Sequence, residues 1–427
     1  METPPPLIDP DSPQPDRRTA FFLLFFSLVV IGAGNTMLIA AIIPPLTREL
    51  ALPDWMAGAI FSFSALWWSL TSPFWGKQSN RLGRRRVVAL GLGGFGVSML
   101  LLLMFAHASL SGWITGAAAV FISLALSRSI FGMFGSATNP AAQAYVADRT
   151  RPEERQSEIA FISSGFSTGT VVGPAFAAAL VGVFGLLSPI LVTCVIAFSL
   201  AFLVLRYLPE HRPPRADAEM YVEPDGARGL WHSRAVLPFL VYAVSLSLVS
   251  GILTQVFVFT VMDTMNVEGR EAAQFTGPAF TVGAMAILLS QLVLIPRLRL
   301  KNRQLMVIGC IPLICGALLL IVAQDFATLV FAQFLIGLGQ GLARPGFSSG
   351  ASLAVSPALQ GNVAGLVISA NGVGFIVTPF FGLFLYEFVS PQLPFMISTA
   401  LLIAMALFAQ FVLGEHGEIG TDERGES

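Results

Sequence analysis

The chain has 427 residues, of which 55% are hydrophobic and only 11% charged, and its formal net charge is -1. A soluble fold cannot bury so much apolar side chain, because even large domains keep a substantial polar surface. The near-neutral charge argues against a nucleic-acid partner. The composition therefore predicts an integral membrane protein.

The chain opens with a proline-rich, polar segment, 1–19, which we expect to be a disordered tail. The apolar run that follows is too long for a signal peptide and lacks a small-residue cleavage pattern, so it is expected to remain as the first helix. Counting runs that can cross about 30 Å of hydrocarbon gives twelve predicted spans, in chain order 20–43, 55–75, 87–106, 114–146, 157–182, 188–208, 236–262, 275–296, 304–323, 327–355, 362–386 and 394–414.

The cations are distributed unevenly over the loops between these spans. Every second loop is rich in Lys and Arg, so that 20 of the 24 cations fall on one side together with both tails. Cations next to membrane spans stay in the cytoplasm. The pattern predicts an inner-membrane protein with both termini, including the tail 415–427, in the cytoplasm.

A long polar segment, 209–235, separates two sets of six spans, 20–208 and 236–414. A shift of 205 residues aligns the sets and pairs Gly132 with Gly337 and Pro140 with Pro345. We therefore expect an all-α membrane protein in which twelve transmembrane helices form two pseudo-symmetric six-helix bundles. Paired repeats of this kind place a substrate site near the middle of the bilayer.

The loop after the second span has the sequence GKQSNRLGRRR, from Gly76 to Arg86. Its pattern Gly-x-x-x-Asn-Arg-x-Gly-Arg-Arg resembles the signature loop of the major facilitator superfamily, in which an aspartate stands at the position of Asn80. The resemblance implies that this loop latches the cytoplasmic gate against the start of the eleventh helix. Asn80 brings no charge to such a latch, and Asp148 is a second candidate to neutralise the arginines.

Two further motifs resemble that superfamily. Arg128-x-x-x-Gly132 is similar to its buried-arginine motif, and Gly165, Gly169 and Gly173-Pro174 resemble the glycine-proline signature of its drug:proton antiporters. Glycines four residues apart also allow close helix packing without any role in transport. The residues expected to act in gating are Gly76, Asn80, Arg81, Gly83, Arg84, Asp148, Gly169, Gly173 and Pro174.

All acidic residues of the predicted spans lie near helix ends, whereas Arg128 lies near mid-depth. A charge at that depth costs at least about 2.5 kcal/mol, so Arg128 should face a polar cavity or a polar partner. Other polar residues of the spans are interhelical hydrogen-bonding groups or parts of the same cavity. The expected substrate-binding residues are Asn35, Arg128, Gln255, Gln340, Arg344 and Asn371.

No catalytic or metal-binding spacing is present, and the glycine string from Gly91 to Gly96 lies within a span, so we expect neither an enzyme nor a cofactor. The favoured interpretation is a monomeric secondary transporter that exports a small neutral or anionic amphiphilic compound across the inner membrane, coupled to protons. An importer or facilitator of a metabolite, such as a riboflavin-like aromatic vitamin, is the alternative. A third is a membrane scaffold or sensor that does not transport.

Overall fold

We analysed a computed structural model that describes residues 16–150, 152–210, 227–298, 300–355 and 359–416. This part of the chain is helical and contains no strand. The first half consists of α1 (Asp16–Met37), η1 (Leu38–Ile42), α2 (Ile43–Glu49), α3 (Asp54–Leu82), α4 (Arg84–Leu110), α5 (Ala117–Ile130), η2 (Phe131–Gly135), α6 (Thr138–Ala147), α7 (Pro152–Phe184) and α8 (Ser188–Tyr207). The second half consists of η3 (Ala227–His232), α9 (Leu237–Met265), α10 (Gly269–Leu289), η4 (Ser290–Leu294), α11 (Ile295–Leu298), α12 (Asn302–Val322), α13 (Phe326–Leu353), α14 (Gln360–Phe388) and α15 (Leu393–His416).

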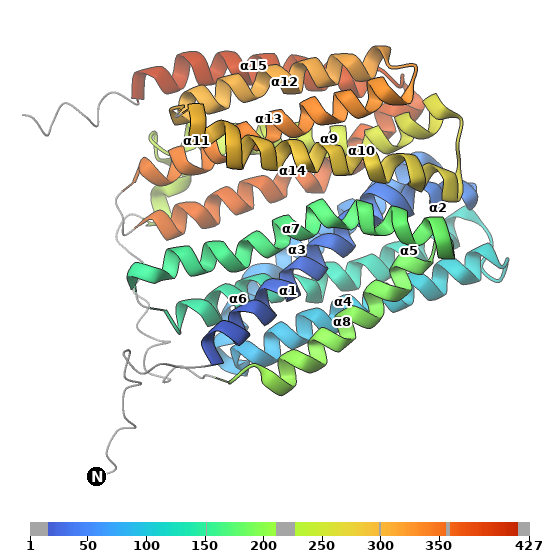
Figure 1. The fold of residues 1–427 in the computed structure, drawn as a ribbon, viewed down its shortest axis with the longest axis horizontal. Helices are drawn as coiled ribbons and strands as arrows, with labels where there is room; N and C mark the ends of the chain where they lie inside the picture. Colours follow the sequence, from blue (N-terminus) through green and yellow to red (C-terminus); the bar gives the residue numbers. More distant parts are fainter. Residues whose placement is uncertain (1–15, 151, 211–226, 299, 356–358, 417–427) are drawn as a thin grey trace, which may run out of the picture.

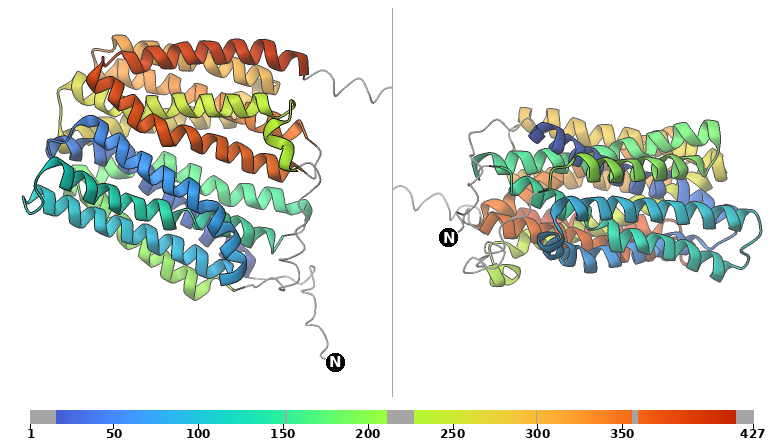
Figure 2. Two further views of the ribbon diagram at one scale, coloured as in Figure 1. Left: turned by 180° about the vertical axis from the view of Figure 1, so that it is seen from behind. Right: turned by 90° about the horizontal axis from the view of Figure 1, so that it is seen from below.

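The long helices run side by side and form two bundles, one from each half of the chain (Figure 1). The view from behind shows the same division (Figure 2). Helix α1 begins, α8 ends, α9 begins and α15 ends at the same side of the molecule, which we call the termini end; the opposite side is the far end. The predicted fold class of two six-helix bundles is confirmed.

Eleven helices of the described chain are long and apolar enough to cross a membrane. The remaining predicted span, 55–75, lies within α3, which is 29 residues long. Its serine and threonine side chains lower its hydropathy, and it packs on α14 of the other bundle. A helix covered by a neighbouring bundle needs fewer apolar side chains than one that faces lipid.

Most helix ends depart from the predicted ends by a few residues, but α3 continues to Leu82, beyond the predicted end at 75, and α10 begins at Gly269, before the predicted start at 275. Helix α1 begins at Asp16, inside the predicted tail, directly after Pro15, and α15 continues to His416. The predicted central loop contains the short helix η3. Three predicted spans are not uniform helices, because each contains a five-residue π-helical segment, η1, η2 or η4.

The bundles contact each other where small residues allow close approach. A Cβ atom on Gly58 of α3 would lie 2.9 Å from the backbone nitrogen of Phe380 in α14. A Cβ on Gly277 of α10 would lie 3.0 Å from the carbonyl oxygen of Pro174 in α7. These two helix pairs, α3 with α14 and α7 with α10, connect the halves.

Candidate functional site: a buried arginine and the polar groups between the bundles

Arg128 is the centre of the candidate site in the first bundle. It lies in the last turn of α5, about 17 Å from the start of that helix at 1.5 Å per residue. Its side chain has 0% exposure and is among the largest fully buried side chains of the protein. Its Nη2 donates a 2.8 Å hydrogen bond to Oδ1 of Asn35 in α1.

The rest of the guanidinium group is surrounded by aromatic rings. Its central carbon lies 4.4 Å from the ring centroid of Phe131 and 5.7 Å from that of Phe61. Nε and Nη1 form no hydrogen bond in the described part of the chain. The charge of Arg128 is therefore balanced by an amide dipole and two π faces, with no described carboxylate in an ion pair with it.

The π-helical segment η2 follows Arg128 directly, and donors from α3 satisfy its backbone. A π turn leaves carbonyl groups without their usual partners. Trp75 Nε1 donates to the carbonyl oxygen of Met133 at 2.6 Å, and Thr71 Oγ1 donates to that of Gly132 at 3.2 Å. Sequence reasoning did not find these contacts, because a regular helix was expected across this segment.

The second bundle contributes a more accessible arginine. Arg344 in α13 is exposed and lies about 27 Å from the start of its helix, near the termini end. Gly339 and Gly346 of the same helix pack on α12, which places Arg344 on roughly the opposite side of α13. No described group forms an ion pair or hydrogen bond with the Arg344 side chain.

The other predicted site residues are distributed over the central helices. Gln340 and Gln255 are buried, with 8% and 3% exposure, and the Gln255 side-chain oxygen has no hydrogen-bond partner among the described groups. Asn35 and Asn371 are half-buried. The structure therefore pairs Arg128 with Asn35 in a closed site and leaves Arg344 open, and it does not join all six residues in one contact network.

The internal repeat shows that the two arginines do not occupy equivalent positions. With the shift of 205 residues, Arg128 corresponds to Gln333, and Arg344 corresponds to Asn139. Gln333 is buried, and Asn139 Oδ1 accepts a hydrogen bond from Gln143. Each bundle thus carries one charged position that is a neutral amide in the other.

The predicted loop from Gly76 to Arg86 is helical except at Gly83, because α3 continues to Leu82 and α4 begins at Arg84. Ion pairs hold this junction. Arg84 Nε lies 3.1 Å from Oδ2 of Asp148 at the end of α6, and Arg84 also donates to Ser79 Oγ. Arg85 Nε lies 3.3 Å from Oε2 of Glu210, a partner that sequence reasoning missed. Asp148 and Glu210 thus supply the negative charge that this loop lacks.

The remaining loop residues have different surroundings. Gly83 ends α3 with φ +94° and ψ 142°, a conformation that glycine adopts readily. Arg81 is exposed, and a Cβ on Gly76 would lie 3.9 Å from Cβ of Pro140. The side chain of Asn80 and those of residues 360–362 lie outside the described groups, so the expected latch between them stays a prediction.

The glycine stripe of α7 packs on α1. Cβ atoms on Gly165, Gly169 and Gly173 would each meet α1 backbone, successively at Phe25, Val29 and Ala33. The following residue, Pro174, contacts α10 of the other bundle through its carbonyl group. This motif therefore lies against a helix of its own bundle on one side and against the bundle interface on the other.

Comparison with known proteins identifies the family. The profile described as the Major Facilitator Superfamily matches residues 24–322 and 273–426. The chain belongs to this superfamily of membrane transporters, as its loop motif indicated.

Individual relatives are distant. The chain is 25% identical to Multidrug resistance protein 2 of Bacillus subtilis over 381 residues, which covers 87% of this chain and 90% of that protein. It is 21% identical to Multidrug resistance protein MdtG of Proteus mirabilis, over 85% of this chain and 88% of that one. A bacterial homologue of the human lysosomal transporter Spinster, solved in an inward-facing, unoccupied conformation, has the same fold with a TM-score of 0.71, 15% identity and coverage of 95% and 97%.

Proposed function

We propose that this protein is a secondary transporter that exports a small neutral or anionic amphiphilic compound across the inner membrane, driven by protons. The termini end then faces the cytoplasm, as the loop cations predict. Two relatives that match most of the chain are named multidrug resistance proteins, which favours export.

The observation that carries the proposed substrate class is the charge of the membrane interior. Arg128 lies at mid-depth and Arg344 is exposed nearer the termini end, whereas the acidic residues of the described spans lie near helix ends. In a medium of low dielectric constant this arrangement repels a permanent cation and attracts carboxylates, phenolates and carbonyl-rich rings. The rings of Phe61 and Phe131 beside Arg128 suit an aromatic solute.

The different exposure of the two arginines suggests different roles. Arg344 is accessible and unpaired among the described groups, so it is suited to the first contact with an anionic substrate. Arg128 is sealed by Asn35 and two rings, so a substrate reaches it only after these groups move. Loss of Arg128 should therefore abolish transport, and loss of Arg344 should weaken binding of anions.

One observation favours a second function. No carboxylate of the described spans lies at mid-depth, where a coupling proton is often carried. An importer or facilitator that moves an anionic metabolite without protons would not need such a carboxylate. Proton dependence and direction distinguish this function from export.

The test is transport by purified protein in vesicles of known orientation. A panel of fluorescent quaternary ammonium, neutral and anionic aromatic compounds is measured with a proton gradient, without one, and with a protonophore. Arg128→Ala and Arg128→Lys are compared with Arg297→Ala, a control that removes an exposed arginine of the termini end. We expect transport of neutral or anionic compounds that collapses without the gradient, fails in Arg128→Ala, recovers little in Arg128→Lys and persists in Arg297→Ala.

Two results would contradict the proposal. Strong transport of quaternary cations that is indifferent to Arg128→Ala would refute both the substrate class and the site. Accumulation in the opposite direction without any effect of the protonophore would favour the facilitator.

A further inference from the structure

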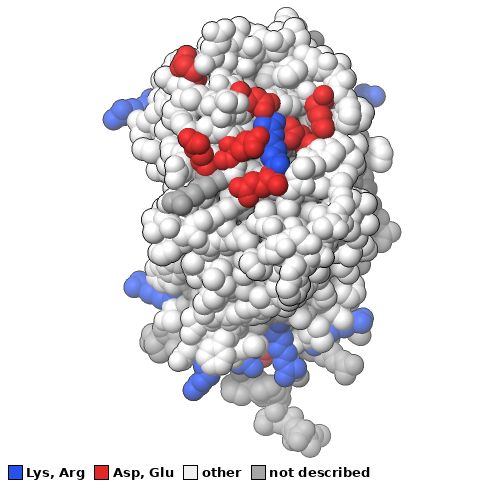
Figure 3. All heavy atoms as spheres, turned by 90° about the vertical axis from the view of Figure 1, so that its right-hand side faces the viewer, with Lys and Arg blue, Asp and Glu red and all other residues white. Residues whose placement is uncertain are grey.

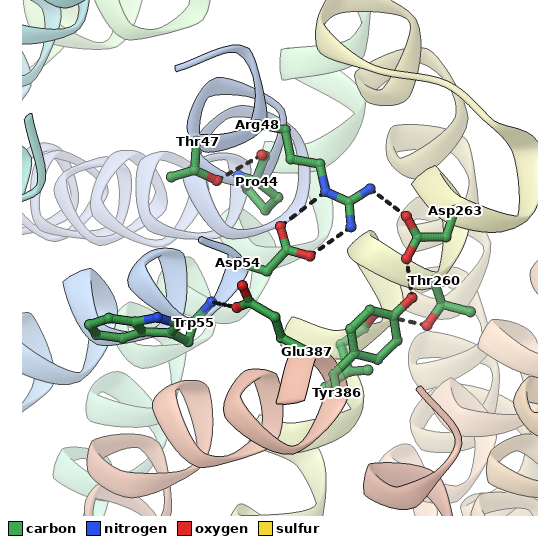
Figure 4. A network of polar contacts seen from close by, with 10 residues as sticks. Pro44, Thr47, Arg48, Asp54, Trp55, Thr260, Asp263, Tyr386 and Glu387 are labelled. Carbon is green, nitrogen blue, oxygen red and sulfur yellow. Dashed lines mark hydrogen bonds and ion pairs between the residues drawn. The ribbon is translucent and has the colours of Figure 1, made fainter. Parts of the chain in front are cut away.

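A polar network connects the two bundles at the far end (Figure 4). Arg48, in α2 of the first bundle, contacts Asp54 at the start of α3 through two hydrogen bonds of 3.0 and 2.7 Å. Its third nitrogen, Nη1, lies 2.5 Å from Oδ1 of Asp263 in α9 of the second bundle. One guanidinium group therefore holds a carboxylate from each bundle.

A second contact crosses between the bundles beside the first. Helix α3 begins at Asp54, so its first backbone N–H groups have no partner within the helix, and the preceding Pro53 gives no side-chain cap. Glu387, at the end of α14, accepts a 2.9 Å hydrogen bond from the backbone N–H of Trp55. A carboxylate of one bundle thus caps a helix of the other, where the helix dipole favours negative charge.

The two contacts are coupled through neighbouring residues. The hydroxyl group of Tyr386 donates a 2.5 Å hydrogen bond to Oδ2 of Asp263, the residue that also accepts from Arg48. Tyr386 is followed directly by Glu387. The residue that contacts Asp263 and the residue that caps α3 are therefore neighbours at the end of α14.

The cluster carries more negative than positive charge. The space-filling view of the far end shows acidic residues gathered around one cation (Figure 3). Besides Asp54, Asp263 and Glu387, the carboxyl group of Glu49 lies against Gly269 at the start of α10 and is repelled by Glu268. Asp54, Asp263 and Glu387 therefore surround Arg48 (Figure 4), and the side chain of Arg270 lies outside the described groups.

Both hydrogen-bonded contacts that cross between the bundles in this network use a carboxylate oxygen as the acceptor, and Arg48 also lies 5.1 Å from the ring centroid of Phe259 in α9. A proton on Glu387 weakens the cap on α3, because the backbone N–H of Trp55 then loses a charged acceptor. The Asp263 side chain is 46% exposed, so the network is open to water from the far side. Acid should therefore weaken the connection between the bundles at this end.

We propose that Arg48, Asp54, Asp263, Tyr386 and Glu387 form a proton-sensitive lock that keeps the far end of the transporter closed, and that protonation of Glu387 releases it. The described spans carry no carboxylate at mid-depth, so the lock provides another place at which protons can act. It assigns the response to protons to the far end of α14. It rests on alternating access alone and not on the direction or substrate proposed above.

The test measures the distance between the bundles at the far end without any substrate. Spin labels are attached to Ser111→Cys, in the loop between α4 and α5, and Gln392→Cys, before α15, in a Cys315→Ser background. Ser111 and Gln392 are exposed, and the two remaining cysteines, Cys194 and Cys310, are buried. Pulsed electron paramagnetic resonance then gives the ratio of joined to separated far ends in lipid nanodiscs.

In the protein with an intact network, we expect this ratio to fall roughly ten-fold between pH 8 and pH 5, the size typical of losing one charged hydrogen bond. Asp263→Asn and Glu387→Gln should each lower the ratio at pH 8, and Glu387→Gln should also reduce its dependence on pH. Asp325→Asn is the matched control, because Asp325 is a far-end carboxylate outside the network that caps α13 through Thr328. Hydrogen bonds from Thr328 hold the pKa of Asp325 below its usual value, so it stays ionised over this range.

An intact network with the same distance distribution at pH 8 and pH 5 would overturn the proposal. The proposal also fails if Asp263→Asn and Glu387→Gln behave like Asp325→Asn. Because no substrate is present, failure of the lock is distinguishable from failure of the proposed export. A transporter of quaternary cations with an acid-sensitive far end would refute the function and support the lock.

Discussion

The glycine stripe of α7 allows a prediction whose size follows from the structure. A Cβ atom on Gly169 would lie 2.6 Å from the backbone nitrogen of Ala33 and 3.0 Å from the carbonyl carbon of Val29, both in α1. Ordinary van der Waals contact begins near 3.4 Å. The carbonyl oxygen of Val29 would lie closer still, so Gly169→Ala forces α1 and α7 apart by at least about 0.8 Å, because these atoms are backbone and cannot rotate away.

Overpacking of this kind costs about 1–3 kcal/mol. We expect Gly169→Ala to lower the temperature at which the detergent-solubilised protein loses its monodisperse elution peak, and to lose transport. Gly93→Ala in α4 is the matched control, since a Cβ there would meet nothing within 4 Å. Helix propensity alone favours alanine at both positions by up to about 1 kcal/mol. Equal stability of the two variants would show that close packing of α1 on α7 does not stabilise the bundle.

Two further predictions concern the termini end and the orientation of the chain. Gly83→Val should abolish transport at normal expression. The φ of +94° at this position costs a branched residue about 1–2 kcal/mol, and the new side chain would meet the carboxylate of Glu210. An active Gly83→Val protein would show that this segment serves only to set the orientation of the chain in the membrane. If the loop cations set the orientation, a membrane-impermeant maleimide added to intact cells should label Gln392→Cys and leave Trp231→Cys of η3 unlabelled. The reverse labelling pattern would place the termini outside the cell.

Much of the fold followed from the sequence because the bilayer imposes a simple rule. Each span must satisfy its own backbone hydrogen bonds over about 30 Å of hydrocarbon, so long apolar runs become helices wherever they occur. Most predicted ends therefore lie close to those of the structure, with the end of α3 and the start of α10 as the exceptions. The motif from Gly76 to Arg86 already indicated the family. The place of Arg128 inside a long apolar helix also followed from counting along its apolar run.

The partners of these residues needed the tertiary structure. Asn35 and Arg128 are 93 positions apart, and Trp55 and Glu387 are 332 apart, so no local pattern predicts that they bond. The sequence placed Asp54, Asp263 and Glu387 only at helix ends, where acidic residues usually face water. Packing of the two bundles brings them around Arg48, because the ends of α2, α3, α9 and α14 meet at the far side. The sequence by itself determined which segments cross the membrane, and only their packing decided which charges lie together.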